Sequence, residues 1–231
     1  MEKRVFVSFD VDGTLVCFEN NIGTHMQAFS KAMTELFGPC GEPQDFLGYP
    51  IAGWMDKKII HHMLEKLGFE ASDANLNRAM QRTEELFEEM FTQVPIIPPG
   101  VEKTLQVLYS MPNVTIGVAS GNLSRIAWKK IGNAGLLKYF KDRIGGFGGY
   151  VYERKDAVIL SRENGEKVIN GKFDIVIHIG DMPNDVNAAI SAGAKAVAVK
   201  TGGIKFDEYP QPSLVLENLE EGFDQFMSLL Q

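Results

Sequence analysis

Residues 5–14 read VFVSFDVDGT, an unbroken apolar run that ends in two aspartates, a glycine and a threonine. A short run of this kind predicts a strand that is buried on both faces, as in a parallel sheet. Asp10 stands at the end of the run and Asp12 two residues on, so both carboxylates can reach one site if the chain curls there. Gly13 permits that curl, and the Thr14 hydroxyl can tie the turn. The stretch therefore predicts a buried strand that delivers two carboxylates to one point.

Five further apolar segments continue the pattern of buried strands. Three of them end in polar residues, and they span residues 114–119, 175–179 and 196–199. Two weaker strand candidates lie at 143–147 and 214–216. The intervening segments carry apolar residues at helical spacing, at 101–111, 123–133, 155–164, 184–192 and 220–230. Strand and helix therefore alternate, which predicts an α/β fold built on a doubly wound, Rossmann-like parallel sheet.

Residues 16–95 break this alternation, because they contain no convincing strand. Three amphipathic helices are predicted in this part, at 21–37, 56–67 and 73–91, and Asp73 is a suitable N-cap for the third. The chain returns to the sheet through a proline-rich stretch at 94–100, which is typical of a stiff linker. We therefore predict a core domain formed by residues 1–15 and 96–231, with a small helical cap domain inserted at 16–95.

Composition limits the classes of partner. The 231 residues carry 23 basic and 30 acidic side chains, a net charge of −7, and no Lys/Arg cluster stands out, so nucleic acid is not expected as a partner. No apolar run approaches the ~18 residues that a membrane-spanning helix needs, and the first residues show no signal-peptide pattern. Cys17 and Cys40 lack the spacing of a zinc site. We expect a cytoplasmic protein that does not contact membranes.

Polar side chains of one chemical character follow three of the predicted strands. Asp10 and Asp12 follow the first, Ser120 the second, and Asp181 with Asp185 the third. In an open parallel sheet, ligands bind beyond the carboxyl ends of the strands. Four carboxylates at one edge cannot all stay charged without a cation, and all-oxygen ligation favours Mg²⁺. The sequence therefore predicts Mg²⁺ as the cofactor at this edge.

Three short motifs stand in a fixed order along the chain: DVDGT at 10–14, VASGN at 118–122 and GDMPND at 180–185. In this combination the chain resembles the haloacid-dehalogenase-like superfamily, in its phosphatase branch with a helical cap inserted after the first motif. Residues 135–140, GLLKYF, also resemble the stretch after the second motif in phosphoglycolate-phosphatase-like members. The resemblance covers nearly the whole chain and implies a phosphatase that acts on a small phosphorylated metabolite.

The resemblance also implies roles for the motif residues. Asp10 becomes the nucleophile that forms an aspartyl phosphate, and Asp12 the general acid and base. Mg²⁺ is then held by Asp10, the backbone carbonyl of Asp12 and Asp181, with Asp185 supporting the metal site directly or through water. Phosphate binding falls to the residues that follow the second strand, Ser120, Gly121 and Asn122.

The family also places a Lys or Arg near the start of a helix that precedes the third of these motifs. The two candidates are Arg154 and Lys155, and we favour Arg154 because phosphoglycolate-phosphatase-like members have an Arg after a Gly-Phe-Gly segment such as 146–148. In the predicted cap, residues 53–56 resemble the loop that faces the substrate. Trp54 and Met55 are therefore the candidates for substrate selection.

Three alternatives to a phosphomonoesterase remain open. A haloacid dehalogenase uses the same nucleophile position, but its pattern lacks a second aspartate such as Asp12. A phosphosugar mutase shares all the motifs and differs mainly in its cap. A non-catalytic phospho-accepting module also clusters acidic residues, but it lacks the Asp12-Gly13-Thr14 sequence and the helical insert.

Overall fold

The computed structural model describes residues 2–18, 23–202 and 209–231 and contains a six-stranded, all-parallel sheet. The strand order is β3-β2-β1-β4-β5-β6. The strands are β1 (Val5–Phe9), β2 (Val114–Ser120), β3 (Gly145–Phe147), β4 (Ile175–Gly180), β5 (Lys195–Val199) and β6 (Leu214–Leu216). All six predicted strands are confirmed. The prediction that the strand at 143–147, which is β3, begins at Arg143 was wrong. Arg143 has a φ of 50°, which does not fit a strand.

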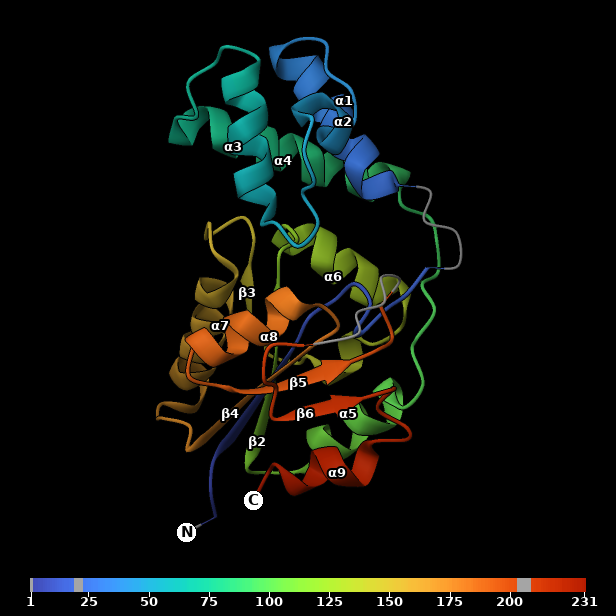
Figure 1. The fold of residues 1–231 in the computed structure, drawn as a ribbon, viewed down its shortest axis with the longest axis vertical. Coiled ribbons are helices and arrows are strands. Elements are labelled where there is room, and N and C mark those ends of the chain that lie inside the picture. The colour runs from blue at the N-terminus through green and yellow to red at the C-terminus, as the bar shows by residue number, and fades with distance from the viewer. Residues whose placement is uncertain (1, 19–22, 203–208) are drawn as a thin grey trace.

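Helices cover both faces of the sheet, which confirms the doubly wound α/β fold (Figure 1). They are α5 (Val101–Ser110), α6 (Ser124–Asn133), α7 (Arg154–Ile169), α8 (Pro183–Ser191) and α9 (Phe223–Ser228), with a 3₁₀ turn at Leu137–Tyr139. The last helix begins later than its predicted start at Glu220, because the Asn218 side chain accepts hydrogen bonds from the N–H groups of Glu220 and Glu221 and holds a turn there. Across the described residues, no helix combines the length and the apolar character needed to span a bilayer.

The strand order places β1 at the centre of the sheet. All five of its residues are buried, and it pairs with β2 on one side and β4 on the other. The chain runs outward from β1 in opposite directions toward β3 and β6, so β1 and β4 flank the point where the winding reverses. The N–H of Asp10 donates to the Ile179 carbonyl at 2.9 Å, which ties the ends of β1 and β4 together. Ligands of doubly wound sheets bind at such a reversal.

The described residues of the insert after β1 form four helices, which lie together beyond the carboxyl ends of the strands (Figure 1). They are α1 (Thr24–Phe37), α2 (Pro43–Leu47), α3 (Asp56–Lys66) and α4 (Asp73–Met90). No strand forms in the described part of 16–95, as predicted. The predicted start of the first helix, Asn21, lies outside the described residues. The short α2 was not predicted, since five residues are too few for a helical pattern.

One detail of the insert corrects the sequence prediction. The N-cap of α4 is Ser72, whose hydroxyl accepts a hydrogen bond from the Asn75 N–H at 3.4 Å. Asp73 is instead the first residue of the helix, where its carboxylate lies near the positive end of the helix dipole. Ser and Asp are about equally good N-caps, so the sequence pattern could not choose between two neighbours.

The insert contacts the rest of the protein through backbone hydrogen bonds and apolar packing. The Asp56 N–H donates to the Gly121 carbonyl at 2.9 Å, and the Lys57 N–H donates to the Gly148 carbonyl at 3.0 Å. Leu123 and Ile126, from the start of α6, are buried in the same apolar cluster as the side chains of α1, α3 and α4. The start of α6 is therefore part of the packed core of the insert.

This close approach makes a prediction about Gly148. A Cβ added there would overlap the Gly121 carbonyl oxygen and lie 2.9 Å from the Asp56 nitrogen. We expect Gly148→Ala to lower the free energy of unfolding by about 1–3 kcal/mol, the usual cost of overpacking. Chemical denaturation measures this change. Gly41→Ala is the matched control, because a Cβ at Gly41 meets nothing within 4 Å. Equal stability of the two variants would contradict the close packing of Gly148 against Gly121 and Asp56.

Candidate active site

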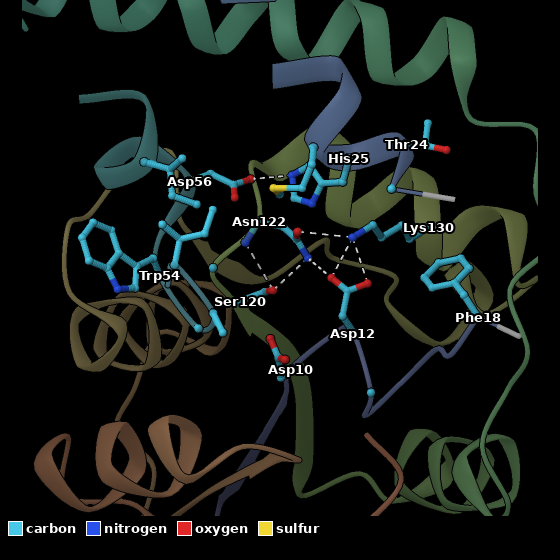
Figure 2. A pocket seen from close by; sticks show the side chains of 18 of the residues that line it. Asp10, Asp12, Phe18, Thr24, His25, Trp54, Asp56, Ser120, Asn122 and Lys130 are labelled. Atoms are coloured by element: carbon cyan, nitrogen blue, oxygen red, sulfur yellow. Dashed lines mark hydrogen bonds and ion pairs between the residues drawn. The ribbon is translucent and has the colours of Figure 1, made fainter. Parts of the chain in front are cut away.

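A cavity of about 750 Å³ lies between the helical insert and the carboxyl ends of the strands. Figure 2 shows the side chains that line it. The sheet side contributes most of the predicted site residues, namely Asp10, Asp12, Ser120, Gly121, Asn122, Arg154 and Asp181. The insert contributes aromatic, aliphatic and acidic side chains together with His25. The structure thus brings residues from widely separated segments of the sequence to one cavity.

Asp10 lies at the floor of this cavity, directly after β1. It is 4% exposed, and its Oδ1 is buried without a hydrogen-bond partner. The Oδ2 lies 3.8 Å from Nη1 of Arg154. Burial raises the pKa of Asp10, although the Arg154 charge opposes this effect. A buried, unpartnered carboxylate oxygen is costly, so this atom is arranged for a ligand or a reaction partner rather than for stability.

Asp181 and Asp185 complete a cluster of carboxylates with Asp10. One oxygen of each lies within 4.8 Å of the others. Burial, and then the charge of Asp10, raise the pKa of Asp181 to about 7. The Asp181 carboxylate accepts a hydrogen bond from Thr14 Oγ1 at 3.2 Å. Gly13, with a φ of 81°, lies so close to Asp181 that a Cβ there would overlap its carboxylate. The turn predicted at Gly13 therefore serves to seat a second acid beside the first.

These residues fit a divalent cation. The donors are all oxygens, one of them has no other partner, and burial together with a neighbouring carboxylate raises the pKa of both Asp10 and Asp181. A bound cation would reverse that effect, since a positive charge nearby favours the ionised carboxylate. Oxygen donors are those that the hard cations Mg²⁺ and Ca²⁺ prefer.

Arg154 is the first residue of α7 and lies between two of the acids. It donates from Nη1 to Asp185 Oδ1, and Asp185 Oδ2 accepts from the Met182 N–H at 3.0 Å at the start of α8. The Arg154 Nε is buried without a partner. Lys155, the alternative cation from the sequence, is exposed to solvent beside a second, smaller cavity. Of the two candidates, Arg154 is the one that reaches Asp10.

The three residues predicted to bind phosphate follow β2, but their side chains do different things. Ser120 is 2% exposed and lies beside Asp10. Gly121 allows close approach, because a Cβ there would lie 2.8 Å from the Trp54 carbonyl oxygen and 3.2 Å from Arg154 Nη2. The Asn122 amide donates to Asp12 Oδ2 at 2.7 Å and to Ser120 Oγ at 3.1 Å. The Asn122 side chain is thus directed to Asp12.

Asp12 is held by a lysine that the sequence analysis did not identify. Lys130, from α6, places its Nζ 2.8 Å from Asp12 Oδ1 and 2.7 Å from Oδ2 (Figure 2). Burial in the cavity would raise the pKa of Asp12, but the Lys130 charge and the hydrogen bond from Asn122 outweigh it and lower the pKa. The side chain of Asp12 remains 43% exposed. A signal was present in the sequence, since Lys130 follows Ile126 and Ala127 at helical spacing on an apolar face.

The insert contributes a second set of side chains. Trp54 lines the cavity, but its ring lies away from Asp10 and Asp12 in Figure 2 and packs against Tyr49 and His62. Met55 is 2% exposed and lines the smaller cavity instead. His25 faces the main cavity, and its Nε2 lies 3.0 Å from Asp56 Oδ2. Of these residues, only Trp54 and Met55 were predicted to select substrate.

Comparisons with known proteins identify a family and similar folds. A family model described as haloacid dehalogenase-like hydrolase matches residues 6–193. The fold is similar to that of a β-phosphoglucomutase from Clostridium difficile, with a TM-score of 0.69 and 18% identity over 100% of this chain and 97% of that chain. A predicted phosphatase from Clostridium acetobutylicum gives a TM-score of 0.67 and 17% identity over 99% and 100% of the two chains. A predicted phosphoglycolate phosphatase from Haemophilus somnus gives a TM-score of 0.64 and 16% identity over 97% of this chain and 98% of that chain. No curated protein matches the chain by sequence.

The carboxylate cluster predicts how stability depends on pH in chelator. The pKa of Asp181 is about 7 in the folded protein, against an ordinary value of 3.8. The folded state therefore binds the proton more tightly, and this contribution to stability is complete below about pH 4 and is lost as the pH rises through 7. We expect the free energy of unfolding to fall over that range by at most roughly 4 kcal/mol from this group.

Thermal or urea denaturation between pH 4 and 8 tests this expectation. Asp181→Asn should show a shallower fall, since the amide does not titrate. Adding Mg²⁺ should restore stability to the wild type mainly above pH 7, where the ligands are deprotonated. Parallel pH profiles for the wild type and Asp181→Asn would contradict the raised pKa.

Proposed function

The chain belongs to the haloacid dehalogenase-like hydrolase family, and we propose that it is a Mg²⁺-dependent phosphomonoesterase acting on a small phosphorylated metabolite through an aspartyl-phosphate intermediate. The observation that carries the proposal is the environment of Asp10. Its buried Oδ1 has no partner, while a guanidinium, a hydroxyl and two further carboxylates surround it. Phosphoryl transfer requires positioning and charge neutralisation above all, and this arrangement supplies both.

In the first step, a carboxylate oxygen of Asp10 attacks the phosphorus atom of the substrate. A bond forms between that oxygen and phosphorus, and the bond from phosphorus to the leaving oxygen breaks. Splitting hydrolysis into two transfers through a carboxylate is an established covalent strategy. Arg154 lies 3.8 Å from Asp10 Oδ2, so its guanidinium can contact an oxygen of the incoming phosphate. Ser120 and the N–H of Gly121 are proposed to bind the remaining phosphate oxygens.

Asp12 is proposed to move the protons. In its protonated form it donates one to the leaving oxygen in the first step, and it becomes the carboxylate that Lys130 and Asn122 stabilise. In the second step it takes a proton from water as that water attacks phosphorus, which releases orthophosphate and regenerates Asp10. Its side chain is 43% exposed toward the cavity, so both a leaving group and a water can reach it.

The metal site is proposed to be formed by Asp10, the backbone carbonyl of Asp12 and Asp181, with Asp185 in support. When bound, Mg²⁺ would neutralise negative charge on the phosphate and on the acids that face it. Asp185 also holds Arg154 and the first turn of α8 through its two oxygens. Its part in the reaction would therefore be to keep the cation and the guanidinium in place together.

We further propose that residues 16–95 act as a cap domain over this site. The docked insert forms part of the cavity wall, and covering the site favours transfer to Asp10 before bulk water reaches the phosphate. Trp54 lines this cavity, and its carbonyl lies close to Gly121 after β2, so changes there would alter the space beside the phosphate. Met55 lines the neighbouring smaller cavity. Substrate choice is expected to depend on Trp54 and on the neighbouring side chains of the insert that face the cavity.

The charges of the insert favour hydrolysis over a phosphosugar mutase reaction. A mutase must hold a second phosphate of its bisphosphorylated intermediate away from the nucleophile, and cations are the natural ligands for it. Among the described residues that line the cavity, the charged side chains of the insert are the carboxylates of Glu42, Asp45 and Asp56. The cations in that lining, Lys130 and Arg154, both come from the sheet side. Asp12 in turn argues against a dehalogenase.

The nucleophile can be tested directly by substitution. Asp10→Asn should reduce the Mg²⁺-dependent release of phosphate from p-nitrophenyl phosphate to background, because an amide cannot form the acyl phosphate. Asp224→Asn is the matched control, since Asp224 is exposed on α9. Circular dichroism should show both variants folded. Phosphatase activity near wild type in Asp10→Asn would sink the proposed mechanism.

The choice between hydrolase and mutase makes a second prediction. Incubated with a hexose 1-phosphate and a catalytic amount of the bisphosphate, the enzyme should release orthophosphate and form no hexose 6-phosphate. Phosphorus NMR separates the products. Sustained isomerisation faster than phosphate release would show that the enzyme is a mutase, and the proposed hydrolysis would be withdrawn.

A further inference from the structure

We propose that Lys130 is a positioning residue that fixes the carboxylate of Asp12 for proton transfer. The inference rests on the proposed role of Asp12 as general acid and base and adds a residue outside the motifs that define the family resemblance. Lys130 lies in the last turn of α6, eight residues after Asn122. Lys130 and Asp12, which are hydrogen-bonded, lie 118 positions apart in the sequence.

The contacts of Lys130 all belong to one small network. Its Nζ donates to both oxygens of Asp12, at 2.8 and 2.7 Å, and to Asn122 Oδ1 at 3.3 Å. The Asn122 Nδ2 then donates to Asp12 Oδ2 at 2.7 Å and to Ser120 Oγ. Figure 2 shows this continuous set of hydrogen bonds above Asp10. The Asp12 carboxylate is thus held from two sides, while 43% of the side chain stays exposed to the cavity.

The burial of Lys130 argues for a purpose other than stability. Its side chain is 5% exposed, and the ammonium lies 5.9 Å from the centre of the Phe87 ring. A buried ion pair commonly contributes no more to stability than apolar side chains of the same volume. A methionine at this position would continue the apolar face formed by Ile126, Ala127 and Ile131. A lysine at this buried position is therefore explained by its contacts with the Asp12 carboxylate.

Helix α6 also connects this network to the insert. The Leu123 N–H donates to Asp56 Oδ2 at 2.7 Å, and the Arg125 N–H donates to Glu84 Oε1 at 3.0 Å. Both acids come from the insert, so the start of α6 is bound to the part of the chain that forms one wall of the cavity. The same rigid element then delivers Lys130 to Asp12. Proton transfer is efficient only when the donor oxygen lies about 2.6–3.2 Å from the oxygen that receives the proton, which is why a fixed carboxylate matters.

The test compares two substrates in the step that phosphorylates the enzyme. An alkyl phosphate has a poor leaving group that needs the Asp12 proton, whereas p-nitrophenolate leaves without it. Lys130→Met should slow single-turnover phosphorylation from 2-phenylethyl phosphate by about 10–100-fold, part of the 10²–10⁴-fold that a general acid contributes, and from p-nitrophenyl phosphate by less than about threefold. Lys129→Met is the matched control, with the same change one residue earlier on α6. It should leave both rates unchanged.

Two further measurements separate positioning from other roles. In an Asp12→Asn background, Lys130→Met should cause no additional loss, because the group it positions is already disabled. Inhibition by orthophosphate should keep its wild-type inhibition constant, because Lys130 does not bind the phosphate. A loss of equal size in both backgrounds, or a weakened orthophosphate affinity, would overturn the inference.

The same measurements distinguish a failure of this inference from a failure of the proposed function. If Asp12→Asn itself shows no dependence on the leaving group, the acid role has failed and the inference falls with it. If Asp12→Asn shows that dependence and Lys130→Met does not, the inference alone is overturned. Should Lys130→Met not fold, Lys130→Gln and Lys130→Arg replace it. The arginine keeps a charged donor and is expected to recover most of the alkyl phosphate rate, and equal rates for the two replacements would contradict positioning.

Discussion

Repulsion among three buried carboxylates is the constraint around which the protein is organised. Asp10, Asp181 and Asp185 offer oxygens within 4.8 Å of one another. Such a cluster opposes folding unless a cation compensates it or protons neutralise it. The fold holds it because β1 and β4 are adjacent, hydrogen-bonded strands whose ends cannot separate. The pairing that builds the centre of the sheet is therefore also what creates the site, and Arg154 at the start of α7 supplies the one guanidinium described beside the cluster.

Helix α6 links this charged edge to the enclosing insert. Its first residues are buried in the apolar cluster of the insert, and two acids of the insert accept hydrogen bonds from its N-terminal N–H groups. One to two turns later, the same helix carries Lys130 to Asp12. In the proposed function, the element that secures the cap is thus the element that orients the proton donor. A substitution that loosens α6 from the insert is expected to impair chemistry as well as docking.

The sequence predicted the strands and the acids at their ends because both depend on local features. A short apolar run such as 5–9, followed directly by polar residues, is typical of a buried strand, and the polar residue that follows it then lies at the edge of the sheet. Lys130 was missed because its role depends on a contact with Asp12, which lies 118 residues away in the sequence. Helical periodicity indicates that Lys130 is on a buried face but does not identify its partner. The N-cap of α4 was placed at Asp73 instead of Ser72 because the two have nearly equal capping propensity. Trp54 and Met55 were grouped by motif, and both line the smaller cavity, but only Trp54 also lines the main one.

The central claim is that the phosphoryl group passes through Asp10, and trapping the intermediate tests it most directly. The enzyme would be mixed with a ³²P-labelled phosphate ester and Mg²⁺, quenched in acid within milliseconds, and reduced with borohydride, which converts an acyl phosphate to an alcohol. Peptide mapping by mass spectrometry then locates the reduced residue. The account predicts transient label that chases into orthophosphate, and homoserine at position 10. Turnover without any acid-stable label, or reduction at another carboxylate with Asp10 intact, would contradict it.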